Sequence, residues 1–271
     1  MQFIEVDGAR LAYAVSGPED GEVFLLSHSL FFNHSMFEPL VRLLNEAGYR
    51  TVAFDHRGQG ASSDAATLDE LSMDALTEDA AGLIRALGLG PVHAVGNSMG
   101  GFVTLRLAAR HPDLVRTVAA LGSSAEEEHK LTEFVPLVES LGVAGGAARG
   151  VDTLLFIMFG DATLGAGGPL VAQWRGYMEN LGPSIRDCGW QVIHRNRLVE
   201  ELRGCTVPVL AIAGAEDHAY PPPTSSETIA DATGGRHVTV AGAGHSVALE
   251  KPDEVARLLI EHAKNPSAVS H

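Results

Sequence analysis

Cysteine is scarce in this sequence, and that scarcity narrows the range of possible folds. Only two of the 271 residues are cysteines, Cys188 and Cys205, and neither lies in a Cys-x-x-Cys or other metal-binding spacing. A disulfide framework is therefore not expected, and both side chains are predicted to be reduced thiols. We likewise predict no bound metal ion.

Positive charge and long apolar runs are also in short supply. The chain has 19 Lys and Arg residues against 34 Asp and Glu, so its formal net charge is −15, and no basic cluster interrupts the acidic background. Such a surface repels phosphate backbones, which argues against nucleic-acid binding. No apolar stretch reaches the ~20 residues that span a bilayer. Because the opening residues MQFIEVDGAR lack the basic start and apolar run of an export signal, we expect a cytoplasmic location.

The remaining composition suits one catalytic domain with a large core, since 45% of the residues are hydrophobic. Short apolar or β-rich runs between turn signals predict strands at 2–6, 10–16, 22–27, 50–54, 92–95, 117–121, 208–213 and 237–240. Helical spacing predicts helices at 36–47, 68–87, 99–110 and 252–263, with another from about 224. This alternation indicates a doubly wound α/β fold with a mostly parallel sheet of eight strands.

Residues 124–205 break the alternation. They contain no convincing strand and are rich in glycine, aromatic and long apolar side chains. We predict that they form a helical cap, or lid, inserted into a core domain made of residues 1–123 and 206–271. The tail NPSAVSH, at 265–271, is expected to be disordered.

A serine between glycines marks the most informative motif. In VHAVGNSMGG, Ser98 directly follows a predicted strand and precedes a predicted helix. Gly96, Gly100 and Gly101 supply the missing side chains that a sharp strand-turn-helix crossing needs, so the hydroxyl is presented clear of the backbone. The alternative, that Ser98 merely caps the helix while the glycines serve close packing, is disfavoured because the motif lies at a strand-to-helix junction. We predict a nucleophile elbow.

A serine nucleophile needs a base and a group that orients the base. Asp217 lies just beyond the predicted strand at 208–213, and His245 lies beyond the strand at 237–240. Parallel strands bring these loops to the same edge of the sheet, where active sites collect. The chain order Ser, Asp, His is that of α/β hydrolases, so we predict the triad Ser98, Asp217 and His245.

Other carboxylates compete for the role of the acid. Glu216 adjoins Asp217, and the run Glu126–Glu128 follows the sixth strand, a second position from which an acid can reach the histidine. We interpret this run as a solvated entrance to the cap. Asp55 ends a strand, but the Arg57-Gly58-Gln59-Gly60 after it is typical of a tight structural turn.

Two backbone amides are expected to bind the oxyanion that forms when the serine attacks a carbonyl. One is the amide of Met99, immediately after the nucleophile. The other is predicted to be the amide of Leu30 in SHSLFFN, a turn that also contains His28, Ser29 and Phe31. For His34, which follows, a surface or helix-capping position is favoured over one that faces the pocket.

These motifs resemble the α/β-hydrolase superfamily from near residue 2 to near residue 263. The matching segments are His28-Ser29-Leu30, DHRGQGASS, GNSMGG, GAEDHAYPP and GAGHSVALEKP. The first two most resemble 3-oxoadipate enol-lactonases and neighbouring bacterial lactonases and esterases. The resemblance implies ester or lactone cleavage through an acyl-serine, with no cofactor. Two departures are the His28-Ser29 pair, where His-Gly is usual, and a cap without a motif that specifies one substrate.

We therefore expect a hydrolase of a small, mainly apolar ester or lactone. The predicted pocket residues are aromatic or long apolar side chains: Phe31, Phe156, Met158, Phe159, Trp174 and Trp190. The same triad also serves carbon–carbon bond hydrolases, cofactor-free haloperoxidase-like perhydrolases and ligand receptors of this fold, so these alternatives stay open. Haloalkane dehalogenases are disfavoured because they need a carboxylate in place of Ser98. A homo-oligomer also remains open.

Overall fold

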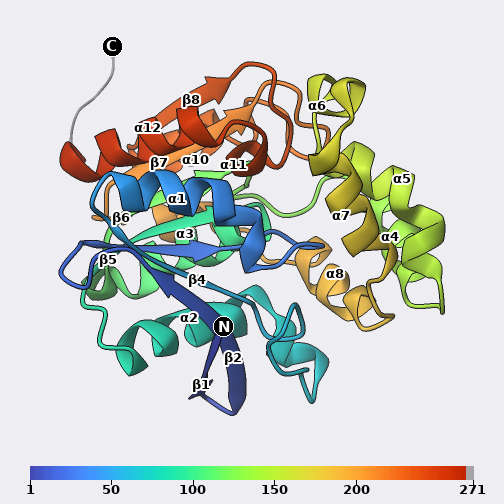
Figure 1. Cartoon of the computed structure of the whole chain (residues 1–271), viewed down its shortest axis with the longest axis horizontal. Helices are drawn as coiled ribbons and strands as arrows, with labels where there is room; N and C mark the ends of the chain where they lie inside the picture. The colour runs from blue at the N-terminus through green and yellow to red at the C-terminus, as the bar shows by residue number, and fades with distance from the viewer. Residues whose placement is uncertain (267–271) are drawn as a thin grey trace.

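The computed structural model describes residues 1–266, and an eight-stranded sheet forms its centre (Figure 1). The strand order is β1-β2-β4-β3-β5-β6-β7-β8. The pairs β1–β2 and β2–β4 are antiparallel and the other neighbours are parallel. The strands are β1 (Gln2–Val6), β2 (Ala9–Ser16), β3 (Val23–Ser27), β4 (Arg50–Phe54), β5 (Val92–Asn97), β6 (Val115–Leu121), β7 (Val209–Gly214) and β8 (Arg236–Val240). This confirms the predicted mostly parallel sheet. Of the tail expected to be disordered, residues 267–271 lie outside the described residues.

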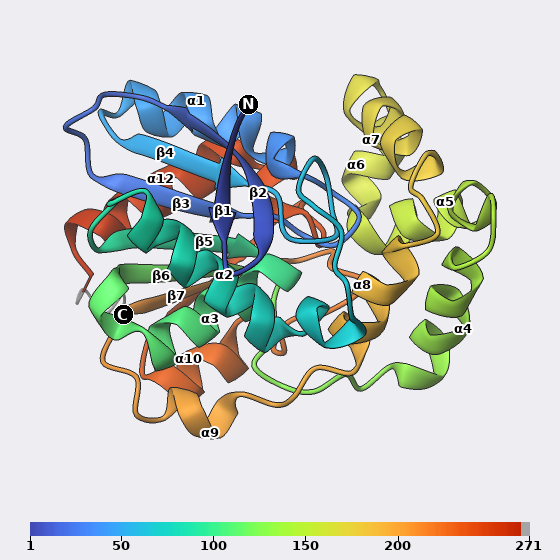
Figure 2. The same ribbon diagram turned by 90° about the horizontal axis from the view of Figure 1, so that it is seen from below.

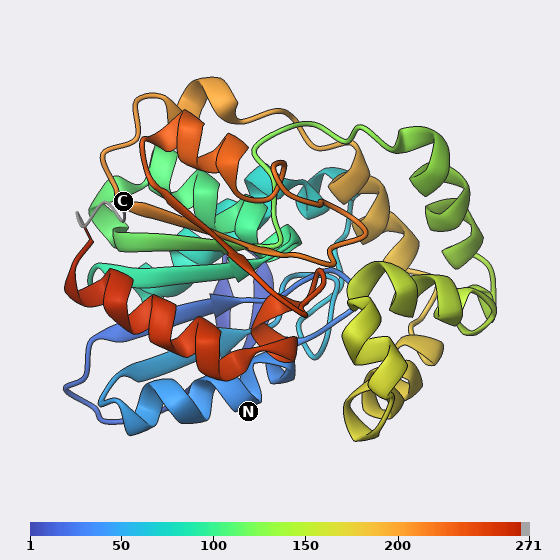
Figure 3. The same ribbon diagram turned by 90° about the horizontal axis from the view of Figure 1, so that it is seen from above.

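Helices cover both faces of the sheet. One face carries α1 (Glu38–Glu46), α11 (Val247–Glu250) and α12 (Pro252–Lys264), as seen from above in Figure 3. The other carries α2 (Met73–Ala86), α3 (Met99–Arg110), α9 (Val199–Leu202) and α10 (Glu227–Thr233), as seen from below in Figure 2. Three short 3₁₀ helices are η1 (His34–Phe37), η2 (Leu68–Leu71) and η3 (Pro112–Leu114). The helix predicted at 68–87 is divided into η2 and α2 because the Ser72 hydroxyl accepts the Ala75 amide and starts a new helix.

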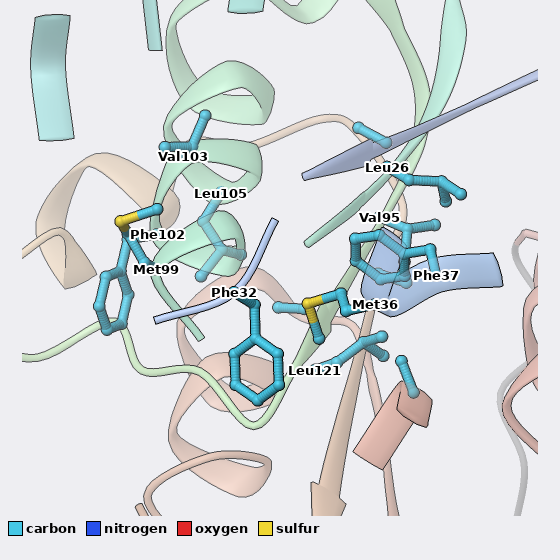
Figure 4. Packing of buried hydrophobic residues seen from close by; sticks show 14 of the residues in the cluster. Leu26, Phe32, Met36, Phe37, Val95, Met99, Phe102, Val103, Leu105 and Leu121 are labelled. Carbon is cyan, nitrogen blue, oxygen red and sulfur yellow. The ribbon is translucent and has the colours of Figure 1, made fainter. Parts of the chain in front are cut away.

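The central strands are apolar because helices bury them on both sides. Every residue of β3, β5 and β7 is buried. Leu26 of β3 is paired in register with Val95 of β5, and Figure 4 shows both close to Phe37 of η1. This packing holds the carboxyl ends of the parallel strands in fixed positions relative to one another.

A helical insert lies between β6 and β7, beyond one end of the sheet (Figure 1). It contains α4 (Leu131–Leu141), α5 (Gly146–Met158), α6 (Asp161–Ala166), α7 (Pro169–Glu179) and α8 (Ile185–Ile193). The helix that follows, α9, packs against α3 and α10 of the core. We retain residues 124–205 as our proposal for the cap. Within residues 1–266, no helix is long and apolar enough to cross a membrane.

The packing of β3 can be tested with Leu26→Ala. Leu26 is 0% exposed, so the substitution removes buried methyl groups and leaves a cavity. We expect it to lower the free energy of unfolding by about 2–5 kcal/mol, measured by urea denaturation. Leu131→Ala is the matched control, because Leu131 is 37% exposed at the start of α4. An equal loss of stability in both variants would contradict this account of the core.

Candidate active site

Ser98 occupies a strained turn between β5 and α3. Its backbone has φ 51° and ψ −113°, a region that residues other than glycine rarely adopt. The turn is held on both sides, because the Ser98 amide donates to the Leu121 carbonyl (2.8 Å) and the Ser98 carbonyl accepts from the Ser123 hydroxyl (2.9 Å). These bonds anchor the elbow to β6 and to the segment after it.

Two of the glycines around Ser98 are required by close approach of the backbone. A Cβ atom on Gly96 would collide with the carbonyl of Gly100, and one on Gly100 would collide with the carbonyl of Ser27. Helix α3 can therefore begin directly against the strands only because both side chains are absent. The result is the elbow geometry predicted from the motif, with Ser98 on the wall of a cavity.

Asp217 and His245 are in direct contact after β7 and β8. The Nδ1 of His245 lies 3.0 Å from Oδ2 and 3.1 Å from Oδ1 of Asp217. Both side chains are buried, and the amides of Ala219 and Tyr220 donate to Oδ1 at 2.8 Å each. A carboxylate only accepts hydrogen bonds, so Nδ1 carries the proton and Nε2 is left as the basic atom.

Ser98 and His245 line the same cavity. Among the described residues, the Ser98 hydroxyl has no hydrogen-bond partner, and catalytic hydrogen bonds of this kind often tighten only when substrate is present. The elbow is tied to the histidine loop by Asn97, whose side-chain amide donates to the His245 carbonyl (3.0 Å). No signal in the sequence distinguished Asn97, because the x positions of Gly-x-Ser-x-Gly are variable by definition.

The insert also contacts the histidine loop. The Ser246 amide donates to the Met158 carbonyl at 3.0 Å. The Glu250 carboxylate bridges the two parts, because Oε1 accepts the Gly244 amide and Oε2 accepts the Gly160 amide, each at 3.0 Å. The position of His245 therefore depends on the insert as well as on the sheet.

The amides of Leu30 and Met99 are the candidate oxyanion donors. Leu30 lines the cavity, and Met99 is the first residue of α3, where a backbone N–H has no partner within the helix. The Leu30 turn is also strained, since Phe31 has φ 70°. Phe31 and Ser98 are thus two of the three non-glycine residues with positive φ among residues 1–266, and both line this cavity.

Neutral histidines support the Leu30 turn from behind. His28 accepts the His56 amide at Nε2 (3.0 Å) and donates from Nδ1 to the Ser29 carbonyl (2.8 Å). His56 Nε2 lies 2.8 Å from the Ser27 hydroxyl. Burial lowers the pKa of His28 and lowers the pKa of His56 well below its ordinary value. Both rings are consequently uncharged, as the acceptor role of His28 requires.

Asp55 has a structural role in this turn, as the sequence predicts. Its Oδ1 accepts from the amide (2.7 Å) and the Nδ1 (2.8 Å) of His34, and its Oδ2 accepts the Ala61 amide (2.9 Å). Although burial opposes ionisation, these hydrogen bonds bring the pKa of Asp55 below its ordinary value. His34 is the first residue of η1, and its side chain is 19% exposed and bonded to Asp55.

The cavity at Ser98 is small and apolar. Its volume is about 50 Å³, and its wall contains no Lys, Arg, Asp or Glu side chain. The lining residues come from the core loops and from α4, α5 and α8: Leu30, Phe31, Ser98, Phe134, Leu137, Val138, Ile157, Met158, Val192, Ile193, Ala219, Tyr220 and His245. A second, polar cavity of about 300 Å³ is lined by residues such as Gln59, Asp64 and Asn180, and no member of the predicted triad lines it.

Phe31 and Met158 are the only two of the six predicted pocket residues that line the apolar cavity. The prediction is corrected for Phe159 and Trp174, which are fully buried and pack on Phe32, with ring centroids 6.1 Å and 4.6 Å away. These large rings fill the interface between insert and core instead of facing the reaction site.

Phe156 and Trp190 also lie elsewhere. Phe156 is 51% exposed and stacks on His218, with ring centroids 4.0 Å apart. Trp190 stacks on His194 at 4.1 Å. The cavity wall is built mainly from aliphatic residues of the insert, whose spacing in the sequence is the same as that of ordinary packing positions. The sequence therefore held no signal that distinguished them.

The acidic run after β6 differs from its prediction. The side chain of Glu128 is only 1% exposed and pairs with Arg195, at 3.1 Å between Oε2 and Nη1, so it is neither solvated nor the acid that contacts His245. Glu126 pairs with Arg197 at 2.6 Å, and Glu127 is exposed. Within residues 1–266, no cluster of three His, Cys, Asp or Glu side chains is arranged to bind a metal ion.

This chain is similar to proteins that are named for different reactions. A sequence profile of the alpha/beta hydrolase fold matches residues 22–141. A candidate carbamate hydrolase, RutD of Caulobacter sp., is 30% identical over 82% of each chain. A candidate non-heme bromoperoxidase, BpoC of Mycobacterium tuberculosis, is 28% identical over 93% of this chain and 97% of its own. The crystal structure of an enol-lactonase from Burkholderia xenovorans matches with a TM-score of 0.89 and 26% identity, covering 97% of this chain and 100% of the other.

The contact between Asp217 and His245 can be tested with Asp217→Asn. An amide can donate to Nδ1, which favours the wrong histidine tautomer and removes the basic Nε2. We expect the rate of Ser98 phosphonylation by a fluorophosphonate to fall by about 10⁴-fold. Asp231→Asn, at an exposed position on α10, is the control and should leave the rate unchanged. Equal rates in both variants would count against the assigned orientation of His245.

The neutral pair His28 and His56 predicts a pH dependence of stability. Their pKa values lie below the ordinary value of 6.5, so the unfolded chain binds protons that the folded chain does not. Stability should therefore be complete above pH 6.5 and should fall as the pH drops below it. Urea denaturation across this range should show a smaller loss for His56→Gln. His237→Gln, at an exposed position, should keep the wild-type slope.

Proposed function

Because the chain belongs to the α/β-hydrolase superfamily, we propose that it is a serine hydrolase that cleaves a carboxylic ester or lactone. In this proposal Ser98 is the nucleophile, His245 is the general base and Asp217 orients the base. The observation that carries the proposal is the cavity lined by both Ser98 and His245, with His245 Nδ1 bonded to a buried carboxylate. That bond leaves the opposite ring nitrogen free to accept the serine proton.

The reaction would proceed in two halves. In the first, His245 Nε2 takes the Ser98 proton while Oγ attacks the substrate carbonyl, and the amides of Leu30 and Met99 stabilise the oxyanion. The tetrahedral intermediate collapses to an acyl-serine as the leaving alkoxide takes the proton from His245. In the second half, water loses a proton to His245 and attacks the acyl carbon. Ser98 then leaves with that proton, and the carboxylic acid is released.

The cavity favours a short and uncharged acyl group. A volume of about 50 Å³ holds only a few water-sized groups, at about 10–15 Å³ each. A carboxylate on the acyl chain would be desolvated without a cationic partner, because no Lys or Arg side chain lines the wall. 3-Oxoadipate enol-lactone carries such a carboxylate, so we propose that the substrate differs from it in being neutral.

Other reactions remain possible for the same three groups, as the carbamate hydrolase and bromoperoxidase names of the two relatives indicate. Carbon–carbon bond hydrolysis, perhydrolysis and ligand sensing without turnover stay as alternatives. No residue of the apolar cavity favours any of them over ester cleavage.

The test is a matched series of p-nitrophenyl esters: acetate, butyrate, octanoate and the negatively charged hemisuccinate. We expect kcat/KM to be highest for the acetate or butyrate and at least tenfold lower for the hemisuccinate, since one buried, unpaired charge costs more than ~1.4 kcal/mol. Ser98→Ala and His245→Ala should each abolish turnover. Lack of turnover of every neutral ester and lactone, together with tight ligand binding, would instead support a receptor.

A further inference from the structure

A buried ion pair lies next to the triad and takes no part in the proposed chemistry. The side chains of Glu128 and Arg195 are each 1% exposed, with Oε2 and Nη1 3.1 Å apart. The Tyr220 hydroxyl joins them, because it donates to Glu128 Oε2 (2.7 Å) and accepts from Arg195 Nη1 (3.1 Å). Burial raises the pKa of the Tyr220 phenol, so it remains a neutral donor at any physiological pH.

The two charged residues come from opposite ends of the insert. Glu128 lies between β6 and α4, where the chain enters the insert, and Arg195 lies between α8 and α9, where it leaves. Arg195 also donates from Nε to the Glu126 carbonyl (3.1 Å) and from Nη1 to the Val192 carbonyl (3.0 Å). The ion pair thus joins both connections between insert and core at one point.

Tyr220 extends this cluster to the triad. Its backbone amide donates to Asp217 Oδ1 (2.8 Å), its ring centroid lies 5.5 Å from that of His245, and its side chain lines the apolar cavity. One residue therefore contacts the acid, the base and the wall of the cavity. The hydroxyl at the far end of its ring is bound to the ion pair.

The Arg195 guanidinium reaches the nucleophile helix as well. It lies 4.1 Å from the ring centroid of Phe102 on α3 and 5.1 Å from that of Tyr220. Its Nη2 has no hydrogen-bond partner in the described part of the chain, and these ring faces are what the cation packs against. The cluster accordingly contacts the elements that carry Ser98 and Asp217.

Stability alone is a weak reason for such a cluster. Removing two charges from water often costs as much free energy as their attraction returns, so apolar residues of similar volume would serve a core equally well. What hydrogen-bonded charges can provide is one preferred geometry for the groups bound to them. Here the group bound to them is the residue that contacts both Asp217 and His245.

We propose that Tyr220 is a positioning residue for the Asp217–His245 pair, held in place by Glu128 and Arg195. The role rests on the proposed serine-hydrolase function, since it concerns the orientation of the general base. The Tyr220 ring limits the movement of the imidazole, and the ion pair fixes the ring. The entry and exit of the insert are thereby coupled to the alignment of the triad.

The decisive variant is Tyr220→Phe. It removes only the hydroxyl and keeps the ring that lines the cavity, so substrate binding and folding should persist. We expect kcat for p-nitrophenyl butyrate to fall about tenfold, as small misplacements of catalytic groups do, while KM stays within about twofold. Tyr13→Phe is the matched control. Tyr13 lies on β2, away from the cavity, and its hydroxyl donates to Gln2 Oε1 (3.0 Å). Deleting this hydroxyl should leave kcat unchanged.

A second variant tests whether the cluster acts as a unit. Glu128→Gln removes the charge that pairs with Arg195 and should also lower kcat. Because both changes release the same ring, the double variant should lose little more than the worse single variant, instead of the product of the two losses. Losses that multiply, or a lower melting temperature with unchanged kcat in Tyr220→Phe, would overturn the proposal.

A readout without substrate separates this inference from the proposed function. The His245 Nδ1 proton bonded to Asp217 should give a low-field proton resonance, and Tyr220→Phe should shift or broaden it while Tyr13→Phe does not. If wild-type protein cleaves no ester, the proposed function fails, and this resonance still decides whether Tyr220 positions the pair. An unchanged resonance in Tyr220→Phe would refute the positioning role.

Discussion

The backbone of Ser98 is held in a conformation that a residue with a side chain seldom adopts, and the geometry of the site depends on this constraint. The turn persists because the Leu121 carbonyl and the Ser123 hydroxyl hold both ends of the residue, and because Gly96 and Gly100 let the chain pass in contact with itself. Strain of this kind needs a rigid surround. The buried strands β3, β5 and β6 provide this rigidity. The orientation of the Ser98 hydroxyl therefore depends on the packing of the sheet.

The insert contributes to the site in two ways. It supplies most of the apolar wall that surrounds Ser98, and no Lys, Arg, Asp or Glu side chain lies in that wall. It also contacts the loops that carry the proposed triad, through Met158 at Ser246, through Gly160 at Glu250 and through Arg195 at Tyr220. The shape of the cavity and the alignment of the proposed catalytic groups therefore both depend on the position of the insert.

Each buried polar group near the site is neutral or ionised depending on the hydrogen-bond partners that surround it. His28 and His56 are uncharged because the rings are desolvated, and this lets His28 accept a backbone hydrogen bond behind the Leu30 turn. Asp55 remains ionised because three hydrogen bonds offset its burial. Ser98, Tyr220 and His245 are the residues with polar side chains that line the cavity, and the rest of its wall is apolar, so electrostatic interactions inside it are strong.

The sequence by itself determined the eight strands, their mostly parallel arrangement and the chain order of Ser98, Asp217 and His245. These depend on local signals: apolar periodicity, glycines at a turn, and loops that follow strands. Only the tertiary structure decided which side chains line the cavity and what Glu128 does. Aliphatic residues such as Val138 and Ile193 have the same spacing whether they face a cavity or a neighbouring helix, and Phe159 and Trp174 proved to be packing residues. Glu128 looked like one of three solvated acids because its partner, Arg195, lies 67 residues away and meets it only after the insert has folded.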